Sequence, residues 1–479
     1  MKKICLSILA LLSLCAPISG KIQMPDILSG NMVLQQSTSA KLWGKAEPDS
    51  RVTIFTSWDR EKYKVMSDEE GKWIVSVQTP EAGYTPYYIE VSDGEKFRID
   101  NILIGEVWLC SGQSNMEMPL GGYRDASVEG GNETIATSAG KKGIRMATIK
   151  KEGAHVPQET CTGVWEVCSP ETTPKFSAVG YYFAERLNQM LDVPVGIINC
   201  SWSGSQLECW LPREIVKDYK DIDLSKADYS NKRNFHAGVS TIMYNGMLKP
   251  LANYTLKGFL WYQGEANCRR HTTYADRLVT LVNRWREDWG LGDLPFYIVE
   301  IAPHIYGGKV QVAAYLREAQ YQAAARLTNC GVVCTNDLLY PDEQYQIHPC
   351  KKKEVGDRLA FMALNRDYGY KDIACESPTY KEMKVEGNKA IISFNNATGF
   401  TSYAHYQFTG FEIAGEDRVF HPAFASTDYR TLTVSVWSNE VEKPVAVRYC
   451  FKNYQIGNLK TNRRLPFAPF RTDNYPPGT

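Results

Sequence analysis

The chain has 479 residues, which is too long for one ordinary domain and predicts two or three. Its content of 43% apolar and 12% aromatic residues supports large packed cores and excludes a disordered protein. Because 54 Lys and Arg residues balance 54 Asp and Glu residues, the charge balance gives no indication of a nucleic-acid-binding protein.

The N-terminus has the features of a secretory signal. Two lysines precede an apolar run over residues 4–15, and small or turn-forming residues follow as far as Lys21. The run is too short to span a bilayer as a mature helix, so we expect residues 1–20 to be a cleaved signal peptide. A lipid anchor on Cys15 is the less favoured alternative, because bulky Leu14 precedes it. No later segment is long enough to cross a membrane, which predicts a soluble protein exported to the periplasm or the medium.

Residues 21–101 are predicted to form a small β-sandwich domain. Short runs of alternating apolar and polar residues, such as 51–55, 73–77 and 87–91, are separated by Gly, Pro, Asp and Ser. Regular spacing of short strands and polar turns is typical of sandwiches.

Residues 102–372 are predicted to form a parallel sheet covered by helices on both faces. Segments with helical periodicity alternate here with short apolar runs, at residues 107–110, 193–198, 256–262, 296–301 and 331–335. Alternation of strands and helices is the pattern of an α/β domain. A β pattern returns over residues 373–479, which either form a sandwich of their own or pack with the N-terminal β domain.

Four polar clusters follow predicted strands or lie beside the last helix. They cover residues 112–116, 201–205, 263–267 and 347–349. Open α/β sheets bind ligands at the carboxyl ends of their strands, so we expect the four clusters to meet at one edge. The sequence therefore predicts a functional site built from segments more than two hundred residues apart.

The residue types at this edge indicate acyl transfer. Ser114 lies in a sharp turn after an apolar run, and a serine hydroxyl becomes a good nucleophile only when a base such as His348 takes its proton. The oxyanion that then develops needs donors already in place. We expect these to be the main-chain N–H groups of Ser114 and Gly204 and the side-chain amide of Gln263. Each residue alone is more often a cap, a turn or a solvated loop, and the hypothesis depends on their joint placement.

These segments resemble the sialate O-acetylesterase family within the SGNH hydrolases over nearly the whole chain. Gly-Gln-Ser-Asn-Met at 112–116 is similar to the family's nucleophile block, and 199–204 to its glycine block. Residues 261–265 resemble the block with the third oxyanion donor, and Ile-His-Pro at 347–349 the histidine block. Three further segments also resemble the family: residues 32–36, 244–247 and 449–454.

The resemblance implies a flavodoxin-like (SGNH) parallel-sheet catalytic domain with flanking β-sandwich domains. It also implies removal of acetyl groups from sugar hydroxyls by a serine, without a metal or other cofactor. The implied partner is an acetylated sugar or glycan, most simply an O-acetylated sialic acid. An acetyl xylan or other polysaccharide deacetylase on the same machinery remains an alternative, as does a non-catalytic sugar-binding protein.

The sequence departs from the family at the residue expected to orient the histidine. The family commonly has an aspartate two residues before it, and Gln346 stands there instead. We weigh three carboxylates of the same loop as replacements, Asp337, Asp342 and Glu343. In the other interpretation Gln346 or a main-chain carbonyl accepts the imidazole N–H, which leaves a Ser–His dyad. We favour the dyad.

Further residues near the clusters are weaker candidates. Glu265, in the third cluster, is a possible supporting residue for the catalytic groups. Trp202 and Asn267 are candidates for sugar binding, and Arg269 and Arg270 could meet the carboxylate of a sialic acid. For the two arginines an exposed, solvated position is at least as common an interpretation.

Overall fold

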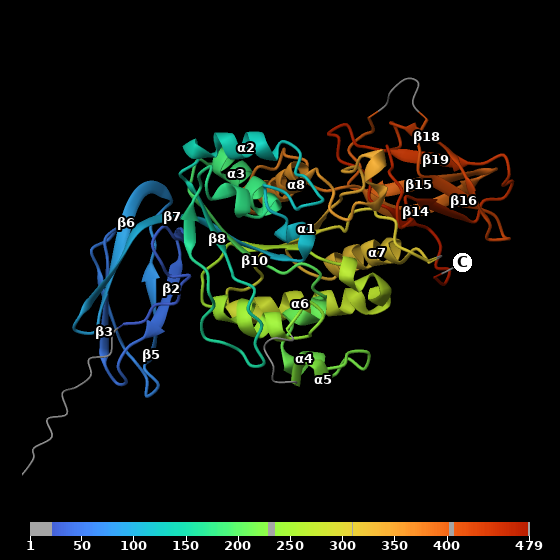
Figure 1. The fold of residues 1–479 in the computed structure, drawn as a ribbon. Helices are drawn as coiled ribbons and strands as arrows, with labels where there is room; N and C mark the ends of the chain where they lie inside the picture. Colours follow the sequence, from blue (N-terminus) through green and yellow to red (C-terminus); the bar gives the residue numbers. More distant parts are fainter. Residues whose placement is uncertain (1–21, 229–234, 309, 402–406, 478–479) are drawn as a thin grey trace, which may run out of the picture.

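The structure, a computed structural model, describes residues 22–228, 235–308, 310–401 and 407–477 (Figure 1). The predicted signal peptide, residues 1–20 with Cys15, lies outside these ranges. Within them, no helix has the length and apolar character needed to cross a membrane.

The N-terminal β domain has the alternating burial expected of a strand with one face in a core. In β3, for example, Val52 and Ile54 are fully buried between more exposed neighbours. The predicted runs coincide with observed strands. The strands are β1 (Val33–Gln35), β2 (Ser39–Lys45), β3 (Arg51–Thr56), β4 (Lys62–Met66), β5 (Lys72–Gln78) and β6 (Gly83–Ser92).

The long strand β7 (Lys96–Gly112) joins the N-terminal domain to the central sheet. Its first part pairs with β6 in antiparallel fashion, and its second part lies between β10 and β11 in the central sheet. The boundary expected near residue 101 therefore falls inside one continuous strand.

The central α/β domain is a mixed sheet in the order β13-β12-β11-β7-β10-β8-β9. Strand β8 pairs with β10, not with β7, and so extends the sheet beyond β10. Counted along the chain without β8, the parallel strands from β10 to β13 read 2-1-3-4-5, the strand order of a flavodoxin-like sheet. The other strands are β8 (Ile144–Thr148), β9 (Trp165–Val167), β10 (Val195–Ser201), β11 (Gly258–Tyr262), β12 (Phe296–Val299) and β13 (Cys330–Val333).

Helices cover both faces of this sheet, as the alternating pattern predicts. Figure 1 shows α3 (Ala178–Leu191) and α8 (Lys352–Asp367) on one side of the sheet and α6 (His271–Trp289) on the other. Helix α7 (Val312–Ala325) packs on the same hydrophobic core as α6. The shorter helices are α1 (Ser114–Glu117), α2 (Gly131–Thr137), α4 (Arg213–Val216) and α5 (Ser225–Asp228).

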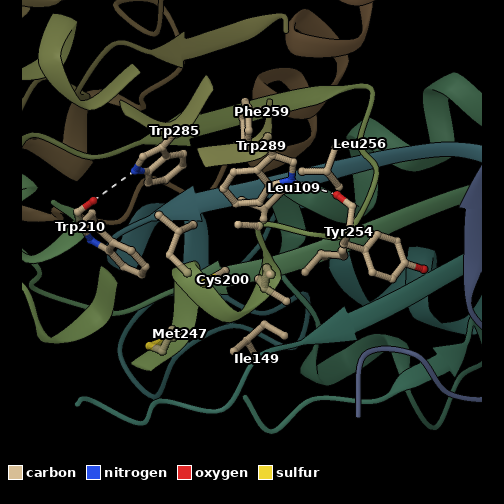
Figure 2. Close-up of a cluster of buried hydrophobic side chains, with 14 of the residues drawn as sticks. Leu109, Ile149, Cys200, Trp210, Met247, Tyr254, Leu256, Phe259, Trp285 and Trp289 are labelled. Atoms are coloured by element: carbon tan, nitrogen blue, oxygen red, sulfur yellow. Dashed lines mark hydrogen bonds between the residues drawn. The ribbon is translucent and has the colours of Figure 1, made fainter. Parts of the chain in front are cut away.

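The core beneath the sheet is rich in tryptophan (Figure 2). The indole N–H of Trp285 donates to the carbonyl of Trp210 at 3.1 Å, and that of Trp289 to the carbonyl of Tyr254 at 2.9 Å. The indoles thus add large apolar surface to the core without leaving these donors unpaired. This packed layer supports the strands whose ends carry the polar clusters.

The C-terminal region forms two four-stranded sheets around a core of its own. Figure 1 places it at the opposite end of the molecule from the N-terminal β domain, so it does not complete that domain. Its strands are β14 (Thr379–Glu386), β15 (Lys389–Asn395), β16 (Phe411–Ala414), β17 (Phe420–Pro422), β18 (Phe424–Asp428), β19 (Thr433–Trp437), β20 (Ala446–Tyr449) and β21 (Phe470–Arg471).

Candidate active site

The turn that carries Ser114 depends on a glycine. Gly112 has φ +133°, and a Cβ there would lie 2.1 Å from the carbonyl oxygen of Tyr262, so only glycine lets β7 end this close to β11. Ser114 is the first residue of α1, and first-turn N–H groups have no acceptor within their helix. The chain leaves β7 and β11 toward opposite edges of the sheet, so Ser114 lies at a topological switch point.

The loop after β10 is fastened to this turn. The N–H of Trp202 donates to the carbonyl of Gly112 at 3.1 Å, and the N–H of Ser203 to the carboxylate of Glu117, in α1, at 2.6 Å. Gly204, with φ +73°, is exposed, and no acceptor for its N–H is found among the described residues. The N–H groups of Ser114 and Gly204 are therefore both available to a ligand oxygen.

The structure corrects the role expected for Gln263. Its side chain is fully buried, and its amide nitrogen lies within hydrogen-bond distance of Gln113 Oε1 (3.2 Å), the Ser205 carbonyl (3.0 Å) and Asn267 Oδ1 (2.8 Å). The two N–H groups of this amide are shared among three acceptors, so neither is left to donate to an oxyanion. Gln263 instead bonds to Gln113, the residue before Ser114, and to the loop after β10.

Asn115, next to Ser114, joins three of the predicted clusters. Its amide nitrogen donates to Glu265 Oε1 at 2.6 Å and to the carbonyl of Ile347 at 3.0 Å. Its amide oxygen accepts a hydrogen bond from Lys352 Nζ at 2.7 Å. Glu265 thus contacts the residue that follows Ser114. Neither Asn115 nor Lys352 was singled out in the sequence.

Tyr123 places Ser114 and His348 in the same corner of the site. Its hydroxyl donates to the main-chain carbonyl of Ser114 at 3.0 Å, and its ring packs edge-on against the imidazole of His348, with centroids 5.0 Å apart. No hydrogen bond between Ser114 Oγ and His348 is found among the described contacts. The Nδ1 atom of His348 is buried and has no partner in the described part of the chain.

None of the three carboxylates weighed as replacements orients the imidazole. Asp337 is buried in ion pairs with Arg358 at 2.7 Å and Lys460 at 2.7 Å. The carboxylate of Glu343 accepts hydrogen bonds from the main-chain N–H groups of residues 340 and 350, which precede and follow it in the chain. Asp342 is exposed and makes no described contact with His348.

The side chain of Gln346 holds the histidine loop through main-chain groups. Its Oε1 accepts the main-chain N–H of His348 at 3.0 Å, and its Nε2 donates to the carbonyl of Asp125 at 2.8 Å. Gln346 therefore ties the loop of His348 to the loop after α1, and it does not contact the imidazole in place of the missing aspartate. Asp125, which the sequence did not indicate, is the acidic residue whose charge favours protonation of His348.

Burial lowers the pKa of His348 from 6.5 to about 4. The positive charge of Lys352 acts in the same direction, and Asp125 opposes both. The imidazole is therefore uncharged at neutral pH and can accept a proton.

The candidate sugar-binding residues divide into two groups. Asn267 is buried and accepts the N–H of Leu207 at 2.9 Å, and Arg270 bonds to Gln206 Oε1 at 2.8 Å, so both are occupied within the protein. Trp202 is half-buried in the loop of Gly204, and Arg269 is exposed. Of the two arginines, only Arg269 makes no hydrogen bond or ion pair within the described part of the chain.

The C-terminal domain reaches the histidine loop through residues 449–454 as well as through Lys460. Asn453 accepts the N–H of His304 at 3.0 Å with its carbonyl and that of Ala313 at 2.9 Å with its side chain. Ile305, which follows His304, donates its N–H to the carbonyl of Gln344 at 2.9 Å. The segment at 449–454 thus holds the loop between β12 and α7 against the loop of His348.

A cavity of about 1040 Å³ lies away from these residues, between the N-terminal domain and the loop around Glu159. It contains none of the predicted catalytic residues, and its lining begins at Gln23, next to the undescribed N-terminus. Among the described residues, no group of three or more His, Cys, Asp or Glu side chains is arranged to hold a metal ion.

Comparison with known proteins defines the class. The family model for carbohydrate esterase, sialic acid-specific acetylesterase, matches residues 104–365, more than half of the chain. The protein is an esterase that acts on carbohydrates. It belongs to the sialic acid-specific acetylesterase family.

Individual relatives agree with this assignment. The crystal structure of a carbohydrate acetylesterase from Xanthomonas citri matches with a TM-score of 0.84 and 32% identity, covering 95% of this chain and 100% of that one. Sialate O-acetylesterase of Homo sapiens is 26% identical over 398 residues, covering 76% of this chain and 75% of the relative. That of Mus musculus is 25% identical and covers 92% of both. The chain is thus a carbohydrate O-acetylesterase, and the non-catalytic alternative is disfavoured.

Proposed function

We propose that Ser114 is the nucleophile and His348 the general base of this esterase. The observation that carries the proposal is that Tyr123 contacts both residues and that Ser114 lies at the switch point of the sheet. Among the described residues, no acceptor is found for the N–H groups of Ser114 and Gly204. The low pKa of His348 supports it, because a base must be uncharged before it accepts a proton.

The reaction follows from these roles. Ser114 Oγ attacks the acetyl carbonyl while His348 takes the hydroxyl proton, and the two N–H groups stabilise the oxyanion. The tetrahedral intermediate expels the sugar oxygen, which receives the proton from His348. A water molecule, deprotonated by His348, then attacks the acetyl-serine, and collapse of the second intermediate releases acetate and restores Ser114 Oγ–H.

The substrate we propose is an O-acetylated sialic acid. The curated relatives are named for this activity, and exposed Arg269 offers a charge for the sialate carboxylate. A neutral acetylated polysaccharide is the second candidate, because Arg270 is already paired with Gln206 and Asp221 and the relative from Xanthomonas citri is titled a carbohydrate acetylesterase.

Acetate release from a substrate panel tests this choice. We expect the purified protein to deacetylate O-acetylated sialic acid with kcat/KM at least about 10-fold above that for acetylated xylan, since one charge-assisted hydrogen bond contributes about 1.5–3 kcal/mol. Arg269→Ala should remove this preference while leaving hydrolysis of an uncharged aryl acetate unchanged. Equal or higher activity on xylan would favour the polysaccharide instead.

The pH dependence of kcat/KM tests the role of His348. Since the uncharged imidazole is the base, activity is present above its pKa and is lost as the pH falls through it. We expect the acid limb of the profile near pH 4, because the pKa of His348 is lowered to about 4. An acid limb near 6.5, the ordinary histidine value, would show that the base is not buried as the structure has it.

A further inference from the structure

A buried lysine and a buried glutamate lie directly behind the nucleophile, joined by one amide. Lys352 at the start of α8 is 1% exposed, Glu265 is 8% exposed and Asn115 between them is fully buried. Transfer of a charge out of water is costly unless the charge is paired and hydrogen-bonded. The reaction proposed above does not use these charges, so their burial needs another explanation.

The bonding capacities of these groups fix the orientation of Asn115. The ammonium of Lys352 can only donate, whereas the main-chain carbonyl of Ile347 can only accept, whatever the charge of Glu265. Asn115 must therefore turn its oxygen to Lys352 and its nitrogen to the other two, as the structure has it. Since Ile347 precedes His348, this orientation attaches the histidine loop to α1.

The titratable groups that face His348 and Lys352 come from several elements. Around His348 they are Lys352 from α8, Asp125 from the loop after α1 and His304 from the loop after β12. Around Lys352 they are Glu265, Glu343 and the thiol of Cys350, with the Tyr262 ring 5.8 Å from the ammonium.

We propose that Lys352 is a positioning residue for His348. Bound to Asn115, its ammonium disfavours a second positive charge on the imidazole and keeps the Asn115 amide turned toward the histidine loop. The inference depends on the proposed function, in which His348 is the base.

The charge of Lys352 is present in the pH range where it is needed. Burial lowers the pKa of Lys352 to about 7, against the opposing effect of Glu265. Below neutral pH, where His348 would otherwise take up a proton, the lysine is cationic. The electrostatic effect on the imidazole is therefore largest on the acid side of the pH profile.

Two substitutions separate the charge from the hydrogen bond. Lys352→Gln removes the charge but keeps an N–H donor for Asn115, whereas Lys352→Met removes both. In both variants we expect the acid limb of kcat/KM for an aryl acetate to move up by about one pH unit, the size of shift that a single nearby charge produces. Only Lys352→Met should also lower kcat at pH 7, because the amide oxygen of Asn115 loses its hydrogen-bond donor.

Lys353→Met is the matched control. It removes the same charge from the adjacent position of α8, where the side chain is exposed and paired with Asp357 at 2.7 Å. We expect its acid limb to coincide with that of the wild type. If Lys352→Met does not fold, the double variant Lys352→Met/Glu265→Gln removes both buried charges together, and it should show the same upward shift.

The outcomes distinguish this inference from the proposed function. If the Lys352 variants fold and their acid limb stays at the wild-type position, the positioning role is overturned and the serine mechanism is left intact. The same holds if a lower melting temperature is the only change. A wild-type protein without activity on any acetyl ester would instead refute the proposed function.

Discussion

Replacing Ser114 with alanine is expected to lower kcat for an aryl acetate by about 10⁴-fold or more, as loss of the nucleophile does in serine hydrolases. The substitution removes one hydroxyl from a residue that is 5% exposed and leaves its main-chain contacts with Tyr123 in place. Stability should therefore change little, and acetate release under saturating substrate measures the effect.

Ser203→Ala provides the matched control for this prediction. Ser203 lies in the neighbouring loop, is exposed, and bonds to Glu117 through its main-chain N–H, which the substitution keeps. We expect this variant to retain activity within about 3-fold. Wild-type turnover by a folded Ser114→Ala protein would remove Ser114 from the mechanism.

The second large effect is expected for His348. His348→Ala should reduce kcat by about 10³-fold or more, because it removes the base whose ring packs against Tyr123 beside Ser114. Gln346→Ala should cost only about 10-fold, since Gln346 bonds to the main chain of His348 and to the Asp125 carbonyl, and not to the imidazole.

The comparison of these two variants decides how the histidine is held. Equal losses in His348→Ala and Gln346→Ala would mean that Gln346 acts through the imidazole after all. A large additional loss in Asp125→Asn, by contrast, would identify Asp125 as the carboxylate that replaces the family's aspartate. Steady-state kinetics at pH 7 with melting temperatures for all three proteins provides the measurement.

The sequence predicted the layout of the fold because its periodicities are simple. Alternating residues in β3 and continuous apolar runs in β10 and β11 gave the correct kinds of strand. The domain boundary was less accurate, because β7 contains an alternating half and a fully buried half, which look like two separate elements. The order of β8 and β10 depends on which strand each one pairs with, and no local pattern encodes this pairing.

The candidate site was predictable where it follows from strand ends. Ser114 and Gly204 follow β7 and β10, whose parallel pairing brings them to one edge. The direction in which a side chain at that edge points was not predictable, so Gln263 was assigned to the ligand side although it packs behind the turn. Lys352 was missed because it stands in a run of three lysines, a pattern typical of a solvated surface.

Covalent labelling is the most direct test of whether His348 activates Ser114. The protein is incubated with a serine-directed fluorophosphonate, and the modified peptide is identified by mass spectrometry. We expect one adduct, on Ser114, which is absent in Ser114→Ala and forms much more slowly in His348→Ala. An adduct on a different serine, or labelling of Ser114 at an unchanged rate without His348, would contradict the proposed roles of the two residues.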